Sequence, residues 1–316
     1  MALNIKTLLL MLLSVSLGLI FIVSGATKLM SMELFEYQFV EIGVAGWKTA
    51  PYFARFLIGL EFFIGILLVL NIAVKKFSAP LAIGILLFFS VYLIYFLIVY
   101  GNKGDCGCFG QALKMSPLAG LIKNIALLIV AFILLWQYDT TFWKKKITRI
   151  LTPILAIISM CCAFFIYPIN VFAHYQFDNN KTDYKVALDL MYDSTQTYKP
   201  TQELRNGKHI VAFFSLTCPH CKMAAKKLKI IHHRHPELPL YIALNGEPKD
   251  TAVFFNETEV QQIPHNLFLG PQSWLMVAGI QLPVIMYLEN GIVKKKVNGI
   301  NLDEDDALNW SQQTIR

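Results

Sequence analysis

Five long apolar segments follow one another in the first half of the chain, separated by short polar loops. A membrane-spanning helix needs about 20 mostly apolar residues, and the segments that meet this requirement are 8–23, 51–70, 80–100, 118–136 and 147–168. The pattern predicts an α-helical membrane bundle with five transmembrane helices. A cleaved signal peptide is the alternative for the first segment, because small residues follow it.

The second part of the chain has the pattern of a soluble α/β domain. Residues 174–182 are polar and are predicted to form a linker, after which the domain occupies residues 183–316. Short apolar runs at 209–216 and 238–246 predict buried strands. Residues 221–231 follow the first of these strands and predict a helix.

The last part of this domain predicts a hairpin and a closing helix. Residues 283–297 contain two strand-like runs around Asn290 and Gly291, which is the signal of a type I′ turn. Residues 301–313 carry several acids near their start and predict a helix with Asn301 as its N-cap.

Composition and charge agree with a membrane protein. The chain is 55% hydrophobic and carries a net charge of +7. Its basic residues lie in clusters between apolar segments and do not form one patch, so we expect the lipid bilayer as a partner and no nucleic acid. The clusters at 75–76 and 144–149 are predicted to be cytoplasmic, which puts the loops 24–50 and 101–116 and everything after residue 168 outside.

The six cysteines form three close pairs, which favours redox or metal chemistry over a disulfide scaffold. Cys218 and Cys221 flank a Pro-His pair at a predicted strand-to-helix junction. Backbone N–H groups and the helix dipole stabilise a thiolate there. We therefore expect Cys218 to attack, Cys221 to resolve, and His220 to add a donor or a positive charge. A zinc half-site or a structural disulfide is the alternative, but no metal is expected, because no second pair of metal ligands lies in this domain.

A second pair, Cys106 and Cys108, lies in a loop predicted to be outside, with only Gly107 between them. A disulfide across one residue closes a small strained ring, and glycine permits the backbone that this needs. Strained disulfides are labile and oxidising. We therefore expect a redox relay, with a structural bridge or one edge of a metal site as the alternative.

The predicted transmembrane segments contain five further candidates. Cys161 and Cys162 lie about 18 Å from the inner face, at 1.5 Å per residue. They are predicted to pack, to act as a redox relay, or to bind metal or lipid. Glu61 lies near the middle of the membrane, where ionisable groups are usually functional. We expect its carboxyl group to be protonated and to act either as a proton shuttle or as a structural acid. Arg55 and Lys123 are expected to reach lipid head groups or to hold an anionic partner.

The C-terminal part resembles the thioredoxin fold in its strand, Cys-Pro-His-Cys, helix and late proline-led hairpin. The resemblance covers residues 183–316 and implies that Pro283 is a cis-proline opposite the dithiol. The Pro-His dipeptide is similar to that of oxidising periplasmic members related to DsbA. The reduction potentials of reducing thioredoxins and of these oxidising proteins differ by about 150 mV. Family members often bury a carboxylate six residues before the first cysteine, where this chain has Ala212.

The N-terminal part resembles the DoxX/MauE family of redox-associated membrane proteins. The matching stretches are GLIFIVSGATKLM, LIGLEFFIGILLV with Glu61, and DCGCFG with Cys106 and Cys108. The resemblance covers residues 5–137 and implies a four-helix domain that handles disulfides outside the cytoplasm, beside a thioredoxin-like partner. The arrangement is also similar to bacterial vitamin K epoxide reductase homologues, in which a quinone-using bundle carries a thioredoxin domain.

These resemblances predict a protein of the bacterial inner membrane with its thioredoxin-like domain in the periplasm. The predicted parts are a four-helix DoxX/MauE-like domain, a fifth transmembrane helix, a linker and the thioredoxin-like domain, at 1–142, 143–173, 174–182 and 183–316.

The predicted function is thiol–disulfide oxidoreductase. Thiols of secreted or periplasmic client proteins would reduce the Cys218–Cys221 disulfide, and that dithiol would reduce the Cys106–Cys108 pair. Electrons would then pass to a membrane quinone, ubiquinone or menaquinone. A reducing relay needs thiols near the cytoplasm, and none of the six cysteines is predicted there. The alternatives are a reductase or isomerase fed by another membrane protein, and a protein that binds or delivers a soft metal such as copper.

Overall fold

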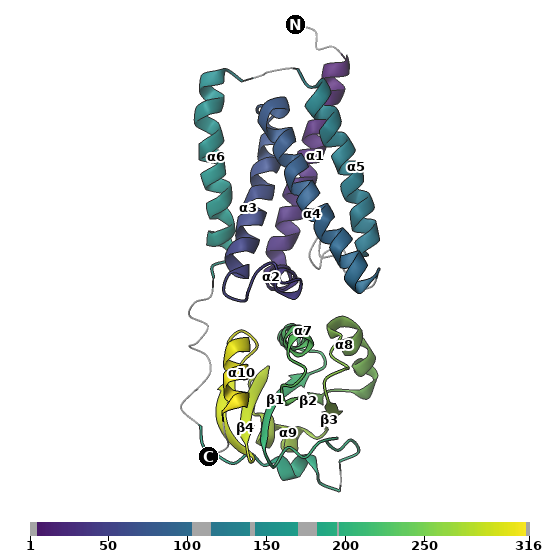
Figure 1. Cartoon of the computed structure of the whole chain (residues 1–316), viewed down its shortest axis with the longest axis vertical. Helices are drawn as coiled ribbons and strands as arrows, with labels where there is room; N and C mark the ends of the chain where they lie inside the picture. The colour runs from purple at the N-terminus through teal and green to yellow at the C-terminus, as the bar shows by residue number, and fades with distance from the viewer. Residues whose placement is uncertain (1–4, 103–114, 140–142, 170–181, 195, 314–316) are drawn as a thin grey trace. The chain divides into compact units, whose positions relative to one another are not determined.

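The computed structural model describes residues 5–102, 115–139, 143–169, 182–194 and 196–313. The chain divides into two compact units, Met1–Ile169 and Asn170–Arg316, a helical bundle and a sheet domain (Figure 1). The predicted linker falls almost entirely within 170–181, which lies outside the described residues. Cys106 and Cys108 also lie outside the described residues. The predicted fold class, an apolar helical bundle followed by an α/β domain, is confirmed.

The described part of the N-terminal unit contains six α-helices. They are α1 (Ile5–Met30), α2 (Met32–Glu41), α3 (Ala50–Val69), α4 (Ala79–Tyr100), α5 (Pro117–Gln137) and α6 (Lys145–Ile166). All except α2 are long and apolar enough to cross a membrane, and a π-helical turn, Val74–Ser78, precedes α4. The five predicted spans are therefore present as helices.

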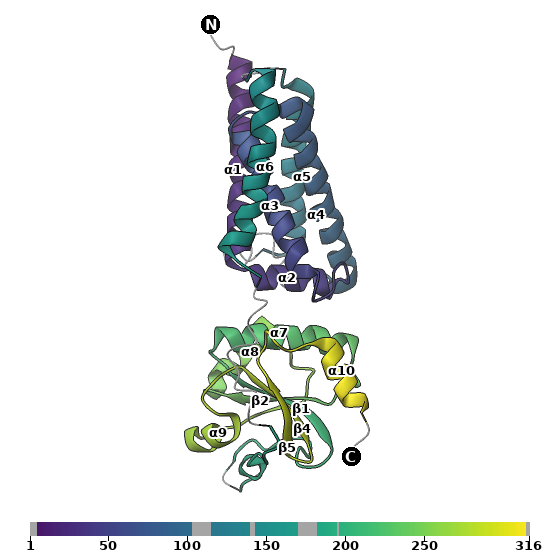
Figure 2. The ribbon, with the colours of Figure 1, turned by 90° about the vertical axis from the view of Figure 1, so that its left-hand side faces the viewer.

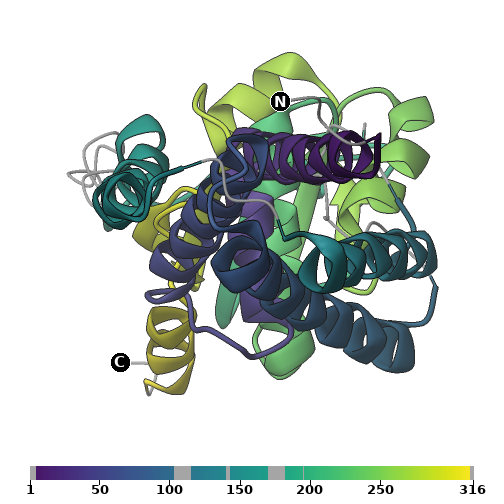
Figure 3. The ribbon, with the colours of Figure 1, turned by 90° about the horizontal axis from the view of Figure 1, so that it is seen from above.

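Two glycines of α3 allow neighbouring helices to approach it closely. A Cβ built on Gly65 would lie 2.8 Å from the backbone oxygen of Gly18 in α1, and one on Gly59 would lie 2.9 Å from Cα of Met160 in α6. Small residues at such crossings let the backbones of membrane helices pack together. Helix α3 is therefore central, while α6 packs on α3 at the edge of the bundle (Figure 3).

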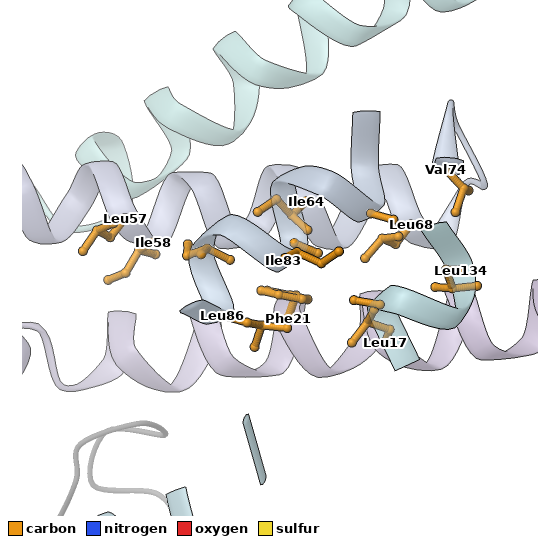
Figure 4. Packing of buried hydrophobic residues seen from close by; sticks show 14 of the residues in the cluster. Leu17, Phe21, Leu57, Ile58, Ile64, Leu68, Val74, Ile83, Leu86 and Leu134 are labelled. Carbon is orange, nitrogen blue, oxygen red and sulfur yellow. The ribbon is translucent and has the colours of Figure 1, made fainter. Parts of the chain in front are cut away.

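The core of the bundle is made of aliphatic side chains and phenylalanines from α1, α3, α4 and α5. Figure 4 shows Leu17 and Phe21 of α1 facing Ile64 and Leu68 of α3. These residues are at most 4% exposed. Since lipid is as apolar as these side chains, close packing rather than escape from water holds such helices together.

Helix α2 corrects the prediction that residues 24–50 form a loop. Helix α1 continues to Met30, and α2 then packs on α3. Phe35 and Phe39, four residues apart on one face of α2, are 3% and 2% exposed. A helix of 10 residues is stable here because it buries this apolar face.

The C-terminal unit contains a five-stranded sheet with the strand order β3-β2-β1-β4-β5. The strands are β1 (Lys208–Ser215), β2 (Leu240–Asn245), β3 (His265–Leu267), β4 (Val284–Glu289) and β5 (Ile292–Val297). Strands β1, β2 and β3 are parallel, whereas β4 pairs antiparallel with β1 and β5 antiparallel with β4. The predicted type I′ turn is present, because Asn290 and Gly291 have φ values of 52° and 74°.

Helices cover both faces of the sheet (Figures 1 and 2). They are α7 (Pro219–Arg234), α8 (Thr251–Thr258), α9 (Pro271–Ala278) and α10 (Glu304–Gln312). Trp274 of α9 packs edge-on against Phe213 of β1, and Trp310 of α10 packs in the same way against Tyr287 of β4. This central mixed sheet between helices, with β1 leading into α7, is the thioredoxin fold.

The N-cap of α10 differs from the prediction. Asp303, not Asn301, caps the helix, and its side chain accepts a hydrogen bond from the N–H of Asp306 at 3.0 Å. The carboxylate of Asp303 also carries negative charge at the positive end of the helix dipole, which favours it over an amide.

Candidate functional site

The Cys-Pro-His-Cys stretch lies where β1 turns into α7. Cys218 is the N-cap of α7, Pro219 occupies the first turn, and the N–H of Cys218 donates to the carbonyl of Ser215 at the end of β1. A proline fits the first turn because its missing N–H would have no partner there. The N–H of Cys221 donates to Sγ of Cys218 at 3.4 Å. The helix start therefore holds the sulfur of Cys218 in the place where backbone N–H groups stabilise negative charge.

The two cysteines differ in their exposure to solvent. Cys218 is half-buried, whereas Cys221 is fully buried, with its Sγ accepting a hydrogen bond from the N–H of Ser215 at 3.4 Å. Burial first, and then the hydrogen bond with Cys218, raise the pKa of the Cys221 thiol. The Cys221 thiol therefore keeps its proton at pH values where an ordinary cysteine ionises, and only Cys218 is placed to attack.

This asymmetry predicts selective alkylation of the reduced full-length chain by iodoacetamide. Even at about pH 9, where an ordinary cysteine is largely thiolate, we expect Cys218 to react at least about tenfold faster than Cys221, because thiolate and access both control the rate. Mass spectrometry of each cysteine peptide measures this. Cys221 should react freely after denaturation, and equal rates in the folded protein would contradict the assignment.

Pro283 lies at the same end of the sheet as the dithiol. The Leu282–Pro283 peptide bond is cis, as the resemblance implies. The next residue, Val284, pairs with Phe213 of β1, so Pro283 stands beside the strand end that leads to Cys218. Ala212 is buried in β1, at the position where the resemblance to the thioredoxin fold suggested a carboxylate. His220 is exposed on the first turn of α7.

A second candidate site is a polar pocket inside the membrane bundle. Nζ of Lys28 lies 2.6 Å from Oε1 of Glu61, and the two side chains are 3% and 2% exposed. Ser24 bridges them, accepting from Nζ of Lys28 at 2.7 Å and donating to Oε1 of Glu61 at 3.3 Å. The sequence analysis named no partner for Glu61, whereas the structure places the ammonium of Lys28 within ion-pair distance of its carboxyl group.

Two other predicted residues have different surroundings from those expected. Arg55 does not extend to head groups: it is 2% exposed, and its guanidinium donates to Glu36 of α2 at 2.6 Å and to the carbonyl of Tyr167 at 2.8 Å. The carboxylate and the carbonyl are both hydrogen-bonded to the guanidinium, which explains why this buried charge is tolerated. Lys123 lines the same pocket as Glu61.

Cys161 and Cys162 do not lie on the buried seam of α6. The buried residues of that helix are Ser159 and Ala163, whereas Cys161 is exposed and Cys162 half-buried. Neither cysteine lines the pocket of Glu61. Cys106 and Cys108 lie outside the described residues, so the relay through them stays a prediction.

Two members of the pocket, Lys28 and Asn124, were not predicted from the sequence. A signal was present for each. Lys28 follows Ser24 by four residues, which places both on one face of a helix, and Asn124 is an amide within an apolar run. Both are buried, at 2% and 3% exposure, and buried polar side chains in a membrane segment usually have a function.

Comparison with known proteins agrees with this organisation. Residues 6–137 match the family model described as Methylamine utilisation protein MauE. Protein TlpB of Flavobacterium psychrophilum is 26% identical over 342 aligned positions, which cover 93% of this chain and 92% of that protein.

Two solved structures from Mycobacterium tuberculosis are similar to part of the chain. DsbF, in mixed oxidised and reduced forms, is 16% identical and matches 34% of this chain and 79% of its own, with a TM-score of 0.29. A secreted disulfide oxidoreductase homologous to DsbE of E. coli is 13% identical and matches 34% of this chain and 82% of its own, with a TM-score of 0.29.

The family match and the folds of the two units lead to one description. Several helices are apolar enough to cross a membrane, so the chain is a multi-pass membrane protein. Its dithiol at the start of α7, beside a cis-proline, has the arrangement of thiol–disulfide oxidoreductases. Residues 6–137 form a MauE family domain, and a domain with the thioredoxin fold follows it in the same chain.

Proposed function

We propose that this protein oxidises the thiols of secreted or periplasmic client proteins and passes the electrons to a membrane quinone. The observation that carries the proposal is the asymmetry of the dithiol, in which Cys218 is accessible at a helix N-terminus and Cys221 is a buried thiol. An accessible sulfur that forms mixed disulfides, next to a protected one that resolves them, is the arrangement that thiol–disulfide exchange requires.

The proposed reaction has three steps, which are two dithiol–disulfide exchanges and the reduction of a quinone. A client thiolate attacks Sγ of Cys218 in the Cys218–Cys221 disulfide, and the client's second thiol then displaces Cys218, which leaves an oxidised client and a reduced dithiol. Cys218 next attacks the Cys106–Cys108 disulfide, and Cys221 releases the mixed disulfide. Each exchange moves two electrons. Re-forming the Cys106–Cys108 disulfide releases two electrons and two protons, which convert a quinone to a quinol.

The proposed direction rests on the positions of the cysteines and on the Pro-His dipeptide. The prediction places four cysteines outside the cytoplasm, namely Cys218, Cys221, Cys106 and Cys108. A relay that took electrons from a cytoplasmic reductant would need a cysteine near the cytoplasm, and none is predicted there. In thiol oxidoreductases, an oxidising protein of the DsbA type has a potential of about −120 mV, against about −270 mV for thioredoxin. A reduction potential near the first value is expected for the Cys218–Cys221 pair, and a value near the second would favour the reductase alternative.

Trapping of mixed disulfides tests the proposal. In Cys221→Ala, the Cys218 thiolate can still attack the Cys106–Cys108 disulfide, but no resolving thiol releases the product, so Cys218 should accumulate as a mixed disulfide with Cys106 or Cys108. A client thiolate that attacks this adduct at Sγ of Cys218 then gives the mixed disulfide with the client. Mass spectrometry of unreduced peptides from the full-length protein identifies both adducts. The variant Cys218→Ala with Cys221→Ala is the control and should trap neither. Absence of any adduct in Cys221→Ala would refute the relay.

A further inference from the structure

We infer that the polar pocket of the bundle is the site of the quinone head group. The inference rests on the proposed function, because it assigns the place where the electrons leave the protein. The empty space in this pocket, including open space at its mouth, is about 560 Å³. Helices α1, α2, α3, α4 and α5 all contribute to it.

Two polar atoms in this pocket lack a hydrogen-bond partner among the described residues. They are Oε2 of Glu61 and Nδ2 of Asn124, from side chains that are 2% and 3% exposed. Buried polar atoms are almost always paired, because leaving one unpaired costs free energy. One acceptor and one donor, both lining the same pocket, indicate a ligand that offers the complementary groups.

The rest of the pocket suits a flat apolar ring. Phe21, Phe35, Phe39 and Phe89 line it together with Tyr92. Aromatic rings pack well against other rings in stacked or edge-on arrangements. The ammonium of Lys28 lies 4.7 Å from the centre of the Phe89 ring, so positive charge is close to this apolar wall.

A quinone matches both the apolar wall and the unpaired atoms. Each of its two oxygens can accept a hydrogen bond from the amide of Asn124. After reduction, each becomes an O–H group that can donate to Oε2 of Glu61. A phospholipid acyl chain offers neither group, and a phosphate head group would bring a second negative charge to Glu61. The carboxylate is satisfied only by the reduced ligand, so the pocket favours the quinol.

The position of the pocket also fits the proposed electron path. Tyr92 lies about two helical turns before the end of α4, and Asn124 about two turns after the start of α5, roughly 11 Å in each case. Ile42, which directly follows α2, packs against the cluster of Tyr92 and Leu93. The segment that joins α4 to α5 carries Cys106 and Cys108 in the sequence, so Tyr92 and Asn124 lie near the helix ends that this segment connects.

Direct binding of quinone and quinol tests the inference without any client protein. The full-length protein is placed in phospholipid nanodiscs, and the dissociation constants of decylubiquinone and its quinol are measured by equilibrium dialysis without oxygen. A short-chain menaquinone is tested in parallel, and saturable binding of either quinone supports the site. In Asn124→Leu, which removes the donor without leaving an unpaired atom, we expect binding of both forms to weaken about tenfold.

Glu61→Gln provides a readout that a purely structural role would not change. The oxygen of the new amide should face Lys28, which leaves its NH₂ group where Oε2 had been. The pocket then loses an acceptor and gains a donor, so quinol binding should weaken about tenfold while quinone binding does not weaken. Ser159→Ala is the matched control, because Ser159 Oγ is also buried without a partner among the described residues but lies outside the pocket. It should leave both constants unchanged.

The outcomes separate this inference from the proposed function. If the wild-type protein binds no quinone, the pocket assignment and the quinone acceptor are both wrong, while the thiol exchange remains supported by trapped mixed disulfides. If it binds quinone but Asn124→Leu and Glu61→Gln bind both forms like the wild type, the pocket assignment alone is wrong.

Discussion

Cys218→Ala abolishes thiol–disulfide exchange by the full-length protein, lowering the rate of client oxidation by about a thousandfold or more. Cys218 is the half-buried sulfur at the start of α7, whereas Cys221 is fully buried and cannot replace it as the attacking group. Since every proposed exchange passes through a mixed disulfide of Cys218, no slower parallel route is left. The rate of disulfide formation in a reduced dithiol peptide measures this.

Two variants make this expectation specific. Cys161→Ala removes a cysteine that is exposed on α6, and it should keep the wild-type rate of peptide oxidation. Cys221→Ala should not turn over, because it cannot form the Cys218–Cys221 disulfide that client thiols reduce. Turnover of Cys218→Ala within tenfold of the wild type would show that the Cys218–Cys221 pair is not the reacting dithiol.

Lys28→Met destabilises the N-terminal unit by about 3–5 kcal/mol. This substitution leaves the Glu61 carboxylate buried without its cation, and breaking one partner of a buried ion pair has a cost of this size. The pair is 2.6 Å apart with both side chains at most 3% exposed, so solvent screening does not reduce the effect. Unfolding midpoints of the protein in nanodiscs, followed by circular dichroism, measure the loss.

The double variant of Lys28→Met with Glu61→Gln should recover most of this loss, because a neutral pair has no unpaired charge to bury. Lys75→Met is the matched control. Its ion pair with Asp139 is exposed, with side chains 42% and 78% accessible, so its removal should leave the unfolding midpoint almost unchanged. A double variant as unstable as Lys28→Met would contradict the assigned role of the pair.

Local patterns in the sequence predicted most of the elements that depend on neighbouring residues. The five apolar spans, the strands β1 and β2, the helix after the dithiol and the turn at Asn290 and Gly291 all belong to this group. Each has its cause within a few residues: an apolar run long enough for a bilayer, or a pair of residues that tolerate positive φ.

Contacts between distant residues were not predictable in the same way. Helix α2 has only 10 residues, and its stability depends on burying Phe35 and Phe39 beside α3. The charged residues within 24–50 predicted a loop, because this burial is not visible in the sequence of that segment. For the same reason, the sequence left open whether Arg55 reaches lipid head groups or holds an anionic partner, and the structure pairs it with Glu36 of α2 inside the protein.

The sequence by itself determined the two-part organisation of this protein and the chemistry of its dithiol, because hydropathy, turn residues and a Cys-x-x-Cys at a strand-to-helix junction act over short distances. The tertiary structure leaves Cys218 half-buried and Cys221 buried, which agrees with the attacking and resolving roles expected from the sequence. Only the tertiary structure decided that Lys28, Glu61 and Asn124, from three different helices, line one pocket. Burial and ion pairing depend on which helix faces pack together, and no single segment of the sequence carries that information.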